Sequence, residues 1–189
     1  MIYLASRSPR RLKLLKQIGV EFEIIDVGID EHWDGREAAR DHVRRLALQK
    51  ARAGKAKLAP YRDIVVIGAD TAVVLDEQVL GKADSREEAE RMLHQLSGRT
   101  HHVYSAVALV TDATEAAALS ISRVTFRILD DKEIKTYCAT GEPLGKAGAY
   151  AIQGRAAAFI ERLDGSCSGV MGLPLFETAQ LLKGSDPFL

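Results

Sequence analysis

The segment IVVIGADT, residues 64–71, decides the fold. Its first four residues are apolar and β-branched, which is typical of a strand buried in a sheet. The glycine and the polar residues that follow predict that this strand ends at Gly68-Ala69-Asp70-Thr71. The active sites of open α/β sheets lie outside the carboxyl ends of strands. We therefore expect the chemistry of the molecule at Asp70.

Helices and strands are predicted on both sides of this segment. Upstream, Ile2–Ala5 and Phe22–Ile25 predict strands, and Ser8-Pro9 predicts the start of a helix between them, because proline is favoured at the first helical position. The other expected elements are a helix from about Glu37 to before Pro60, a hairpin of Ala72–Leu75 and Val79–Leu80, a helix over 86–96, strands over 100–110 and 117–128, a helix from Asp130 to about Cys138, a strand over Ala157–Ile160 and a helix from about Leu173. This pattern predicts a single α/β domain over residues 1–189, with a mixed, largely twisted central sheet flanked by helices.

Composition limits the classes of partner. The chain carries 26 Lys and Arg and 26 Asp and Glu, so no overall positive field attracts nucleic acid or a membrane. Cys138 and Cys167 lack CxxC or Cys/His spacing, which predicts reduced thiols rather than disulfides or structural zinc. No apolar run approaches the ~18 residues of a membrane span. We expect a cytoplasmic protein that binds phosphates locally, if at all.

A first candidate site is SRSPRR, residues 6–11, where a strand leads directly into a helix. The free N–H groups of a helix start bind anions, and the helix dipole adds positive potential there. Arg10 and Arg11 in the first helical turn oppose that dipole unless an anion is bound between them. The alternative is an ordinary helix start with two solvated arginines.

Acidic residues form a second candidate site. Asp70 can hold a divalent cation or accept the proton of an attacking water. A free aspartate has a pKa of ~3.9 and is a weak base for bulk water, so this role requires a metal. Asp30 and Glu31 could complete a magnesium or manganese site with oxygen ligands. The alternatives are an aspartate that caps a turn and two solvated loop carboxylates.

Lysines and one glutamine complete the set. Lys50, Lys82 and Lys146 are candidates for contacting phosphates. Gln153, in the segment GKAGAYAIQG at 145–154, offers the donor and acceptor that pair with O4 and N3–H of uracil or thymine, although a surface glutamine is the alternative. The motifs GxGxxG and GxxxxGK[ST] are absent from the sequence, which weighs against a Rossmann cofactor site and a P-loop.

Taken in order, five motifs closely resemble the Maf family of nucleotide pyrophosphatases almost from end to end: SRSPRR, GADT, GK at 81–82, GEPLGKAGAYAIQG and GLPL at 172–175. The resemblance implies a fold akin to inosine triphosphate pyrophosphatases, with two lobes around a cleft. It also implies cleavage between the α and β phosphates of a small-molecule nucleotide with a divalent metal, Mg²⁺ or Mn²⁺.

The resemblance also implies roles for single residues. Asp70 would be the proton acceptor and, with Glu31, a metal ligand. The residues expected on phosphates or around the reacting atoms are Ser6, Arg11, Lys50, Lys82 and Lys146. Those that match the dTTP/UTP type of the family are Arg10, Thr71 and Gln153. Two positions depart from the family pattern, because Gly145 replaces an aspartate found in many members and Ala83 replaces the usual proline.

The expected reaction is hydrolysis of dTTP, UTP and modified pyrimidine nucleotides to the monophosphate and pyrophosphate. Two alternatives come from other classes: a non-catalytic, nucleotide-responsive regulator of cell division, since the family is also associated with septum formation, and a plain nucleotide-binding module. A homodimer is a further expectation.

Overall fold

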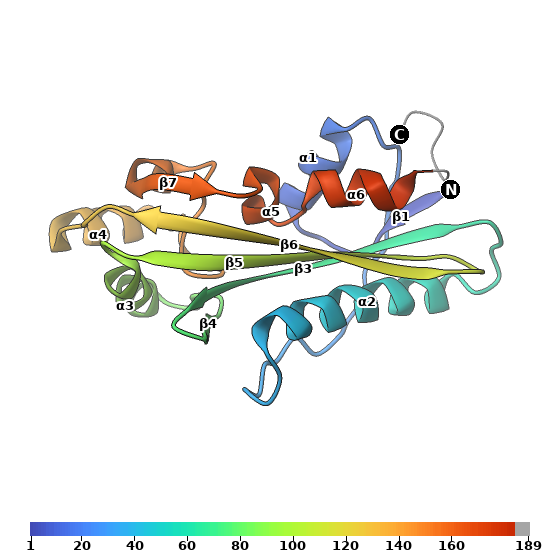
Figure 1. Ribbon diagram of the computed structural model, residues 1–189, viewed down its shortest axis with the longest axis horizontal. Coiled ribbons are helices and arrows are strands. Elements are labelled where there is room, and N and C mark those ends of the chain that lie inside the picture. Colours follow the sequence, from blue (N-terminus) through green and yellow to red (C-terminus); the bar gives the residue numbers. More distant parts are fainter. Residues whose placement is uncertain (184–189) are drawn as a thin grey trace.

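A single seven-stranded sheet with helices on both faces organises the computed structural model, which describes residues 1–183 (Figure 1). The strands are β1 (Ile2–Leu4), β2 (Glu23–Ile24), β3 (Val65–Leu75), β4 (Gln78–Leu80), β5 (Thr100–Val110), β6 (Glu115–Phe126) and β7 (Ile160–Asp164). The helices are α1 (Pro9–Gln17), α2 (Ala39–Lys57), α3 (Arg86–Leu96), α4 (Asp131–Cys138), the 3₁₀ helix η1 (Arg155–Phe159), α5 (Cys167–Met171) and α6 (Leu175–Leu182). The strand order is β2-β1-β3-β5-β6-β7, with β4 also paired to β3. Strand β1 runs parallel to β2 and β3 and every other pair is antiparallel, so the predicted mixed α/β fold is confirmed.

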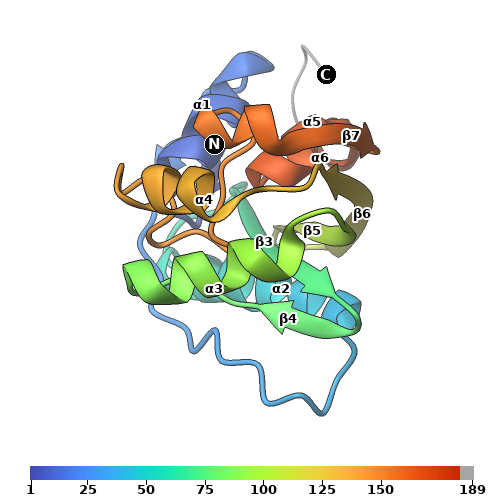
Figure 2. The same ribbon diagram turned by 90° about the vertical axis from the view of Figure 1, so that its left-hand side faces the viewer.

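The long strands β3, β5 and β6 run through two lobes. In the first lobe α2 covers one face of the sheet and α1 and α6 cover the other (Figure 2). Neighbouring residues of β3 point to opposite faces, so Val66 packs in the core under α2 while Ile67 packs in the core under α1 and α6. The second lobe has one core, which includes Leu93 of α3, Ile134 of α4 and Phe126 of β6.

The predicted end of the strand at 68–71 is wrong. Strand β3 continues to Leu75, and Asp70 lies in its middle. Its hydrogen-bonded partner β5 runs beside it from Val66 to Val74, so nothing interrupts the ladder. Gly68 serves helix packing rather than a turn, because a Cβ there would lie 2.1 Å from the Ala47 carbonyl oxygen of α2.

The other edge of β3 is open around Asp70. Strand β1 pairs with β3 only at Val65–Ile67, and β4 pairs with it only at Val73–Leu75. Among residues 1–183, no strand covers residues 68–72 on this side. The strand whose carboxyl end opens the site is therefore β1, and Asp70 faces the gap beyond it.

Elements with strong local signals agree with the sequence. Helix α3 has the predicted bounds, and α4 begins after Asp130, whose side chain and that of Glu133 form a capping box.

The predicted strand over Ala157–Ile160 is wrong, because Arg155–Phe159 forms a 3₁₀ helix and β7 begins at Ile160. The buried residues Ala156 and Phe159 stand three apart, the period of that helix.

Three smaller predictions can also be compared with the structure. Cys138 and Cys167 are free thiols, as predicted. The last helix starts at Leu175 rather than Leu173, and the short α5 precedes it. Within residues 1–183, every helix is too short or too polar to cross a bilayer.

Candidate active site

A cavity of about 470 Å³ lies at the open edge of β3, and we call it the cleft. Of the eleven candidate residues that the sequence indicates, ten line it: Ser6, Arg10, Arg11, Glu31, Lys50, Asp70, Thr71, Lys82, Lys146 and Gln153. They come from the turn before α1, the first turn of α1, the loop after β2, helix α2, strand β3, and the loops after β4 and α4. Folding thus gathers side chains that are up to 147 positions apart in the sequence.

Helix α2 places Lys50 against Asp70. The helix can approach β3 because Gly68 and Gly54 have no side chains at the contact. Lys50 follows Ala47 by almost one turn, and its Nζ lies 2.7 Å from Oδ1 of Asp70. The two side chains are only 7% and 11% exposed, so this is a buried ion pair. The alternative of an aspartate that caps a turn is wrong, because Asp70 lies within a strand.

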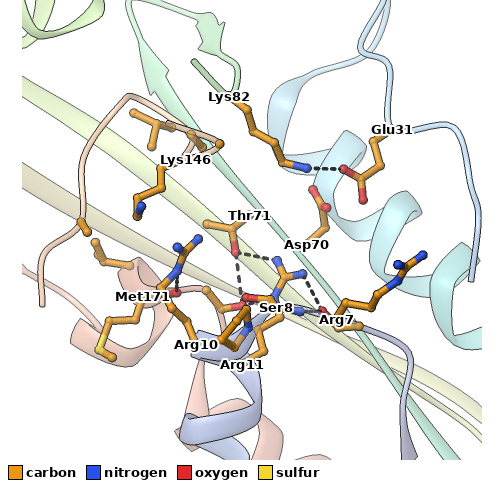
Figure 3. A pocket seen from close by; sticks show the side chains of 18 of the residues that line it. Arg7, Ser8, Arg10, Arg11, Glu31, Asp70, Thr71, Lys82, Lys146 and Met171 are labelled. Carbon is orange, nitrogen blue, oxygen red and sulfur yellow. Dashed lines mark hydrogen bonds and ion pairs between the residues drawn. The ribbon is translucent and has the colours of Figure 1, made fainter. Parts of the chain in front are cut away.

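Glu31 joins this pair from the loop between β2 and α2. One carboxylate oxygen lies 2.6 Å from Lys50 Nζ. The other lies 2.8 Å from Lys82 Nζ, and Figure 3 shows this second contact. Burial acts to raise the pKa of Glu31, but hydrogen bonds from the two ammonium groups outweigh it and lower the pKa to about 2. Glu31 is therefore anionic at neutral pH. It links the first lobe to Lys82, which follows β4.

Thr71 and Arg11 lie on the other face of β3. Asp70 and Thr71 point in opposite directions from the strand, yet both reach the cleft because the edge between them is open. The Arg11 guanidinium donates to the Gly172 carbonyl oxygen at 2.7 Å, to Thr71 Oγ1 at 3.4 Å and to Ser6 Oγ at 3.5 Å. Burial lowers the pKa of Arg11, although an arginine stays charged at neutral pH. Its charge is therefore held at the cleft.

The helix start that the sequence indicated opens into the cleft. Ser8 precedes α1 without a capping bond from its side chain, and its N–H donates to Ser6 Oγ at 3.2 Å. Arg10 donates to the Met171 carbonyl oxygen at 3.3 Å. Arg10 and Arg11 are both half-buried, so the alternative of two solvated arginines is wrong.

The loop after α4 forms the wall on the side of the second lobe. Lys146 donates to the backbone oxygen of Glu142, and burial lowers its pKa. Gln153 lies exposed at the cleft, beside the apolar lining residues Ile152 and Tyr150. This wall offers an apolar surface with one amide, which suits a flat heterocyclic base.

The cleft carries an excess of positive charge although the chain as a whole is neutral. Six cationic side chains line it, Arg7, Arg10, Arg11, Lys50, Lys82 and Lys146, against three anionic ones, Asp26, Glu31 and Asp70. Such an excess, enclosed in a cavity, attracts and holds a polyphosphate. The positive charge of the cleft therefore gives a physical reason to expect phosphate binding there.

Asp70 and Glu31 are too few to fill the coordination shell of a metal, so water or substrate phosphate would have to supply the remaining oxygen ligands. Residues 1–183 contain no group of three or more His, Cys, Asp or Glu side chains arranged to hold a metal. Asp70 and Glu31 both lie within 2.7 Å of Lys50 Nζ, so their oxygens converge on one cationic centre. Two carboxylates with the remaining positions filled by water and phosphate are a common magnesium arrangement. Asp30 is not among the residues that line the cleft, and its carboxylate accepts from the His32 N–H at 2.9 Å.

Several residues in or beside the cleft receive no role from the sequence alone. Tyr150 lines it, and its hydroxyl lies 2.9 Å from Nε2 of the buried His101. Ser105 lies 2.8 Å from Thr71 Oγ1, and Arg7 pairs with Asp26 at the cleft. Arg10 and Arg11 donate to backbone carbonyl groups. Every residue has such a group, so no sequence motif could have identified these partners.

Comparisons with known proteins agree with this geometry. The family model described as Maf-like protein matches residues 1–185. A dTTP/UTP pyrophosphatase of Alkalilimnicola ehrlichii is 58% identical over 96% of this chain and 91% of that protein. Proteins of the same name from Aromatoleum aromaticum and Xanthomonas euvesicatoria are each 53% identical over 96% of this chain, and cover 94% and 97% of their own lengths.

A solved structure shows the same fold at low sequence identity. The Staphylococcus aureus Ham1 protein matches with a TM-score of 0.52 over 97% of this chain and 96% of its own, at 13% identity. The family match covers nearly the whole chain, and the relatives extend over the same length. The chain therefore belongs to the Maf family.

Proposed function

We propose that this protein hydrolyses dTTP and UTP to the monophosphate and pyrophosphate. The observation that carries the proposal is the buried Asp70–Lys50 pair, joined by Glu31, inside a cleft with a surplus of cationic side chains. The relatives named dTTP/UTP pyrophosphatase, at 53–58% identity over nearly the whole chain, support the same substrates. Modified pyrimidine nucleotides belong to the same substrate class.

In the proposed reaction, water attacks the α-phosphorus and Asp70 accepts its proton. The bond between the α-phosphorus and the oxygen that bridges to the β-phosphate breaks. Arg11, Lys50 and Lys82 offset the charge that grows on the departing pyrophosphate. Little covalent chemistry is required of the protein, so positioning and electrostatics supply most of the rate.

Other cleft residues hold the two ends of the nucleotide. Ser6 and Lys146 would contact phosphates. Gln153, with Arg10 and Thr71, would select the base. Asp70 and Glu31 would also hold Mg²⁺ or Mn²⁺, which polarises phosphate oxygens when bound.

Three further expectations belong to this proposal. Residues 1–189 act as one catalytic domain. The protein works in the cytoplasm, in keeping with its free thiols. The expected homodimer stays a prediction, which light scattering on the purified protein tests.

The decisive experiment is a product assay on purified protein. Canonical and modified triphosphates are supplied with Mg²⁺ or Mn²⁺, and the products are identified by ³¹P NMR. Pyrophosphate from UTP and dTTP supports the proposal. Release of a terminal phosphate, or binding without turnover as expected of a regulator or binding module, contradicts it.

A further inference from the structure

Glu142 joins the two ends of the loop that carries Lys146 and Gln153. Its carboxylate accepts the Tyr137 hydroxyl at 2.9 Å on one oxygen and the Arg155 backbone N–H at 3.1 Å on the other. The Arg155 amide lies two residues beyond Gln153. One side chain therefore ties the exit of the loop back to its entry.

The carboxylate fits tightly against the loop. A Cβ built on Gly154 would lie 2.2 Å from Glu142 Oε1 and 2.7 Å from Oε2, closer than atoms approach in proteins. The φ of Gly154 is −108°, which other residues also adopt. Glycine is therefore needed here for space rather than for its backbone conformation.

Tyr137 anchors this arrangement in the core of the second lobe. It belongs to α4, is 3% exposed and packs edge-on against Phe159 at 5.1 Å between ring centres. Burial and the contact with Glu142 raise the pKa of Tyr137, so its hydroxyl stays a donor at neutral pH. The position of Glu142 is thus set by a rigid helix rather than by the loop itself.

We propose that Glu142 is a positioning residue that holds Gln153 ready to read the base. The inference rests on the proposed function, in which Gln153 contacts uracil or thymine. It concerns Gln153 rather than Lys146, because Lys146 donates to the backbone oxygen of Glu142, which a side-chain substitution leaves in place. Asp70 and Lys50 lie on β3 and α2, so the reacting end of the site is separate.

Glu142→Gln tests the inference with little change in shape. The amide oxygen can still accept from Tyr137, but the NH₂ group faces the Arg155 N–H, two donors that repel. We expect KM for UTP to rise about 10-fold while kcat changes less than about 3-fold, since only base binding is loosened. Selectivity for UTP over GTP should fall by about the same factor as KM rises.

Gly154→Ala provides an independent test that leaves the Glu142 carboxylate intact. The added methyl group displaces that carboxylate, so the same rise in KM and the same loss of selectivity are expected. Glu161→Gln, which removes an exposed carboxylate on β7, is the matched control for charge and should behave as the unaltered protein.

Hydrogen exchange separates a failure of this inference from a failure of the proposed function. Faster exchange over residues 145–154 in Glu142→Gln and Gly154→Ala, measured without nucleotide, supports the positioning role whatever the substrate is. Unchanged exchange in both folded variants overturns it, and so does a fall in kcat with unchanged KM and selectivity. If the unaltered protein releases no pyrophosphate from UTP or dTTP, the proposed function fails and exchange alone decides the role of Glu142.

Discussion

Lys50 neutralises Asp70 inside the protein: its ammonium nitrogen lies 2.7 Å from the Asp70 carboxylate and 2.6 Å from that of Glu31. A buried charge without a partner is costly, so Lys50 and Asp70 stabilise each other as a buried ion pair, and Glu31 adds a second, more exposed carboxylate to Lys50. Incoming phosphates and a metal would redistribute these contacts, because Lys50 can turn to phosphate while the carboxylates turn to the metal. The charged groups that the proposed reaction needs are therefore already close together in the free protein.

Asp70→Asn should lower kcat for UTP by about 10³-fold, because an amide cannot accept the proton of the attacking water. Binding should change little, since the cationic side chains of the cleft remain. Steady-state pyrophosphate release and equilibrium binding of a non-hydrolysable UTP analogue measure the two effects. Asp164→Asn, at a surface pair with Arg123, is the control and should keep full activity. Normal turnover in Asp70→Asn would remove the proposed mechanism.

Lys50→Met and Lys82→Met should differ sharply in their effect on the free energy of unfolding. Lys50 is 7% exposed, and its loss leaves two carboxylates facing each other, so a destabilisation of about 3 kcal/mol is expected. Lys82 is 60% exposed, and its pair with Glu31 should contribute less than about 1 kcal/mol. Urea denaturation at neutral pH measures both. Equal effects would show that the Lys50 cluster is not buried in solution.

His101 should make stability depend on pH between about 6.5 and 4. Burial lowers the pKa of His101 to about 4 in the folded protein, against an ordinary value of 6.5. The unfolded chain thus binds a proton in this range that the folded protein refuses. Stability is complete above pH 6.5 and falls as the pH drops towards 4, by about 3 kcal/mol in total.

Denaturant unfolding at several pH values measures this slope. His101→Gln keeps a polar partner for Tyr150 but cannot titrate, so the contribution of this site to the slope should disappear. Identical pH profiles for the unaltered protein and His101→Gln would contradict the assignment.

The parts of the fold that the sequence predicts well are those with signals a few residues apart. Ser85 accepts from the Glu88 N–H at the start of α3, and Asp130 and Glu133 cap α4 reciprocally. Such caps depend only on neighbours in the chain. The bounds of these two helices therefore follow from local sequence.

The middle of β3 could not be predicted in the same way. Gly68 looks like a turn residue in any short window, but its role depends on Ala47 in α2, 21 positions away. The strand continues past Asp70 because β5 pairs with it along its length. Local patterns and family motifs together predict the residues of the candidate site, whereas the contact of Lys50 with both acidic residues depends on tertiary packing.

Gln153→Glu should change which pyrimidine base is preferred. Glutamine can donate to O4 and accept from N3–H of uracil, whereas glutamate offers only acceptors and repels O4. The kcat/KM for UTP should fall on the order of 10²-fold, while CTP, which presents an amino group at that edge, should lose less. Competition between UTP and CTP in one reaction measures the ratio directly. Gln180→Glu, on the exposed side of α6, controls for the added charge and should leave the ratio unchanged. An unaltered ratio in Gln153→Glu would mean that Gln153 does not contact the base, and the apolar wall at Tyr150 and Ile152 would then have to select it by shape.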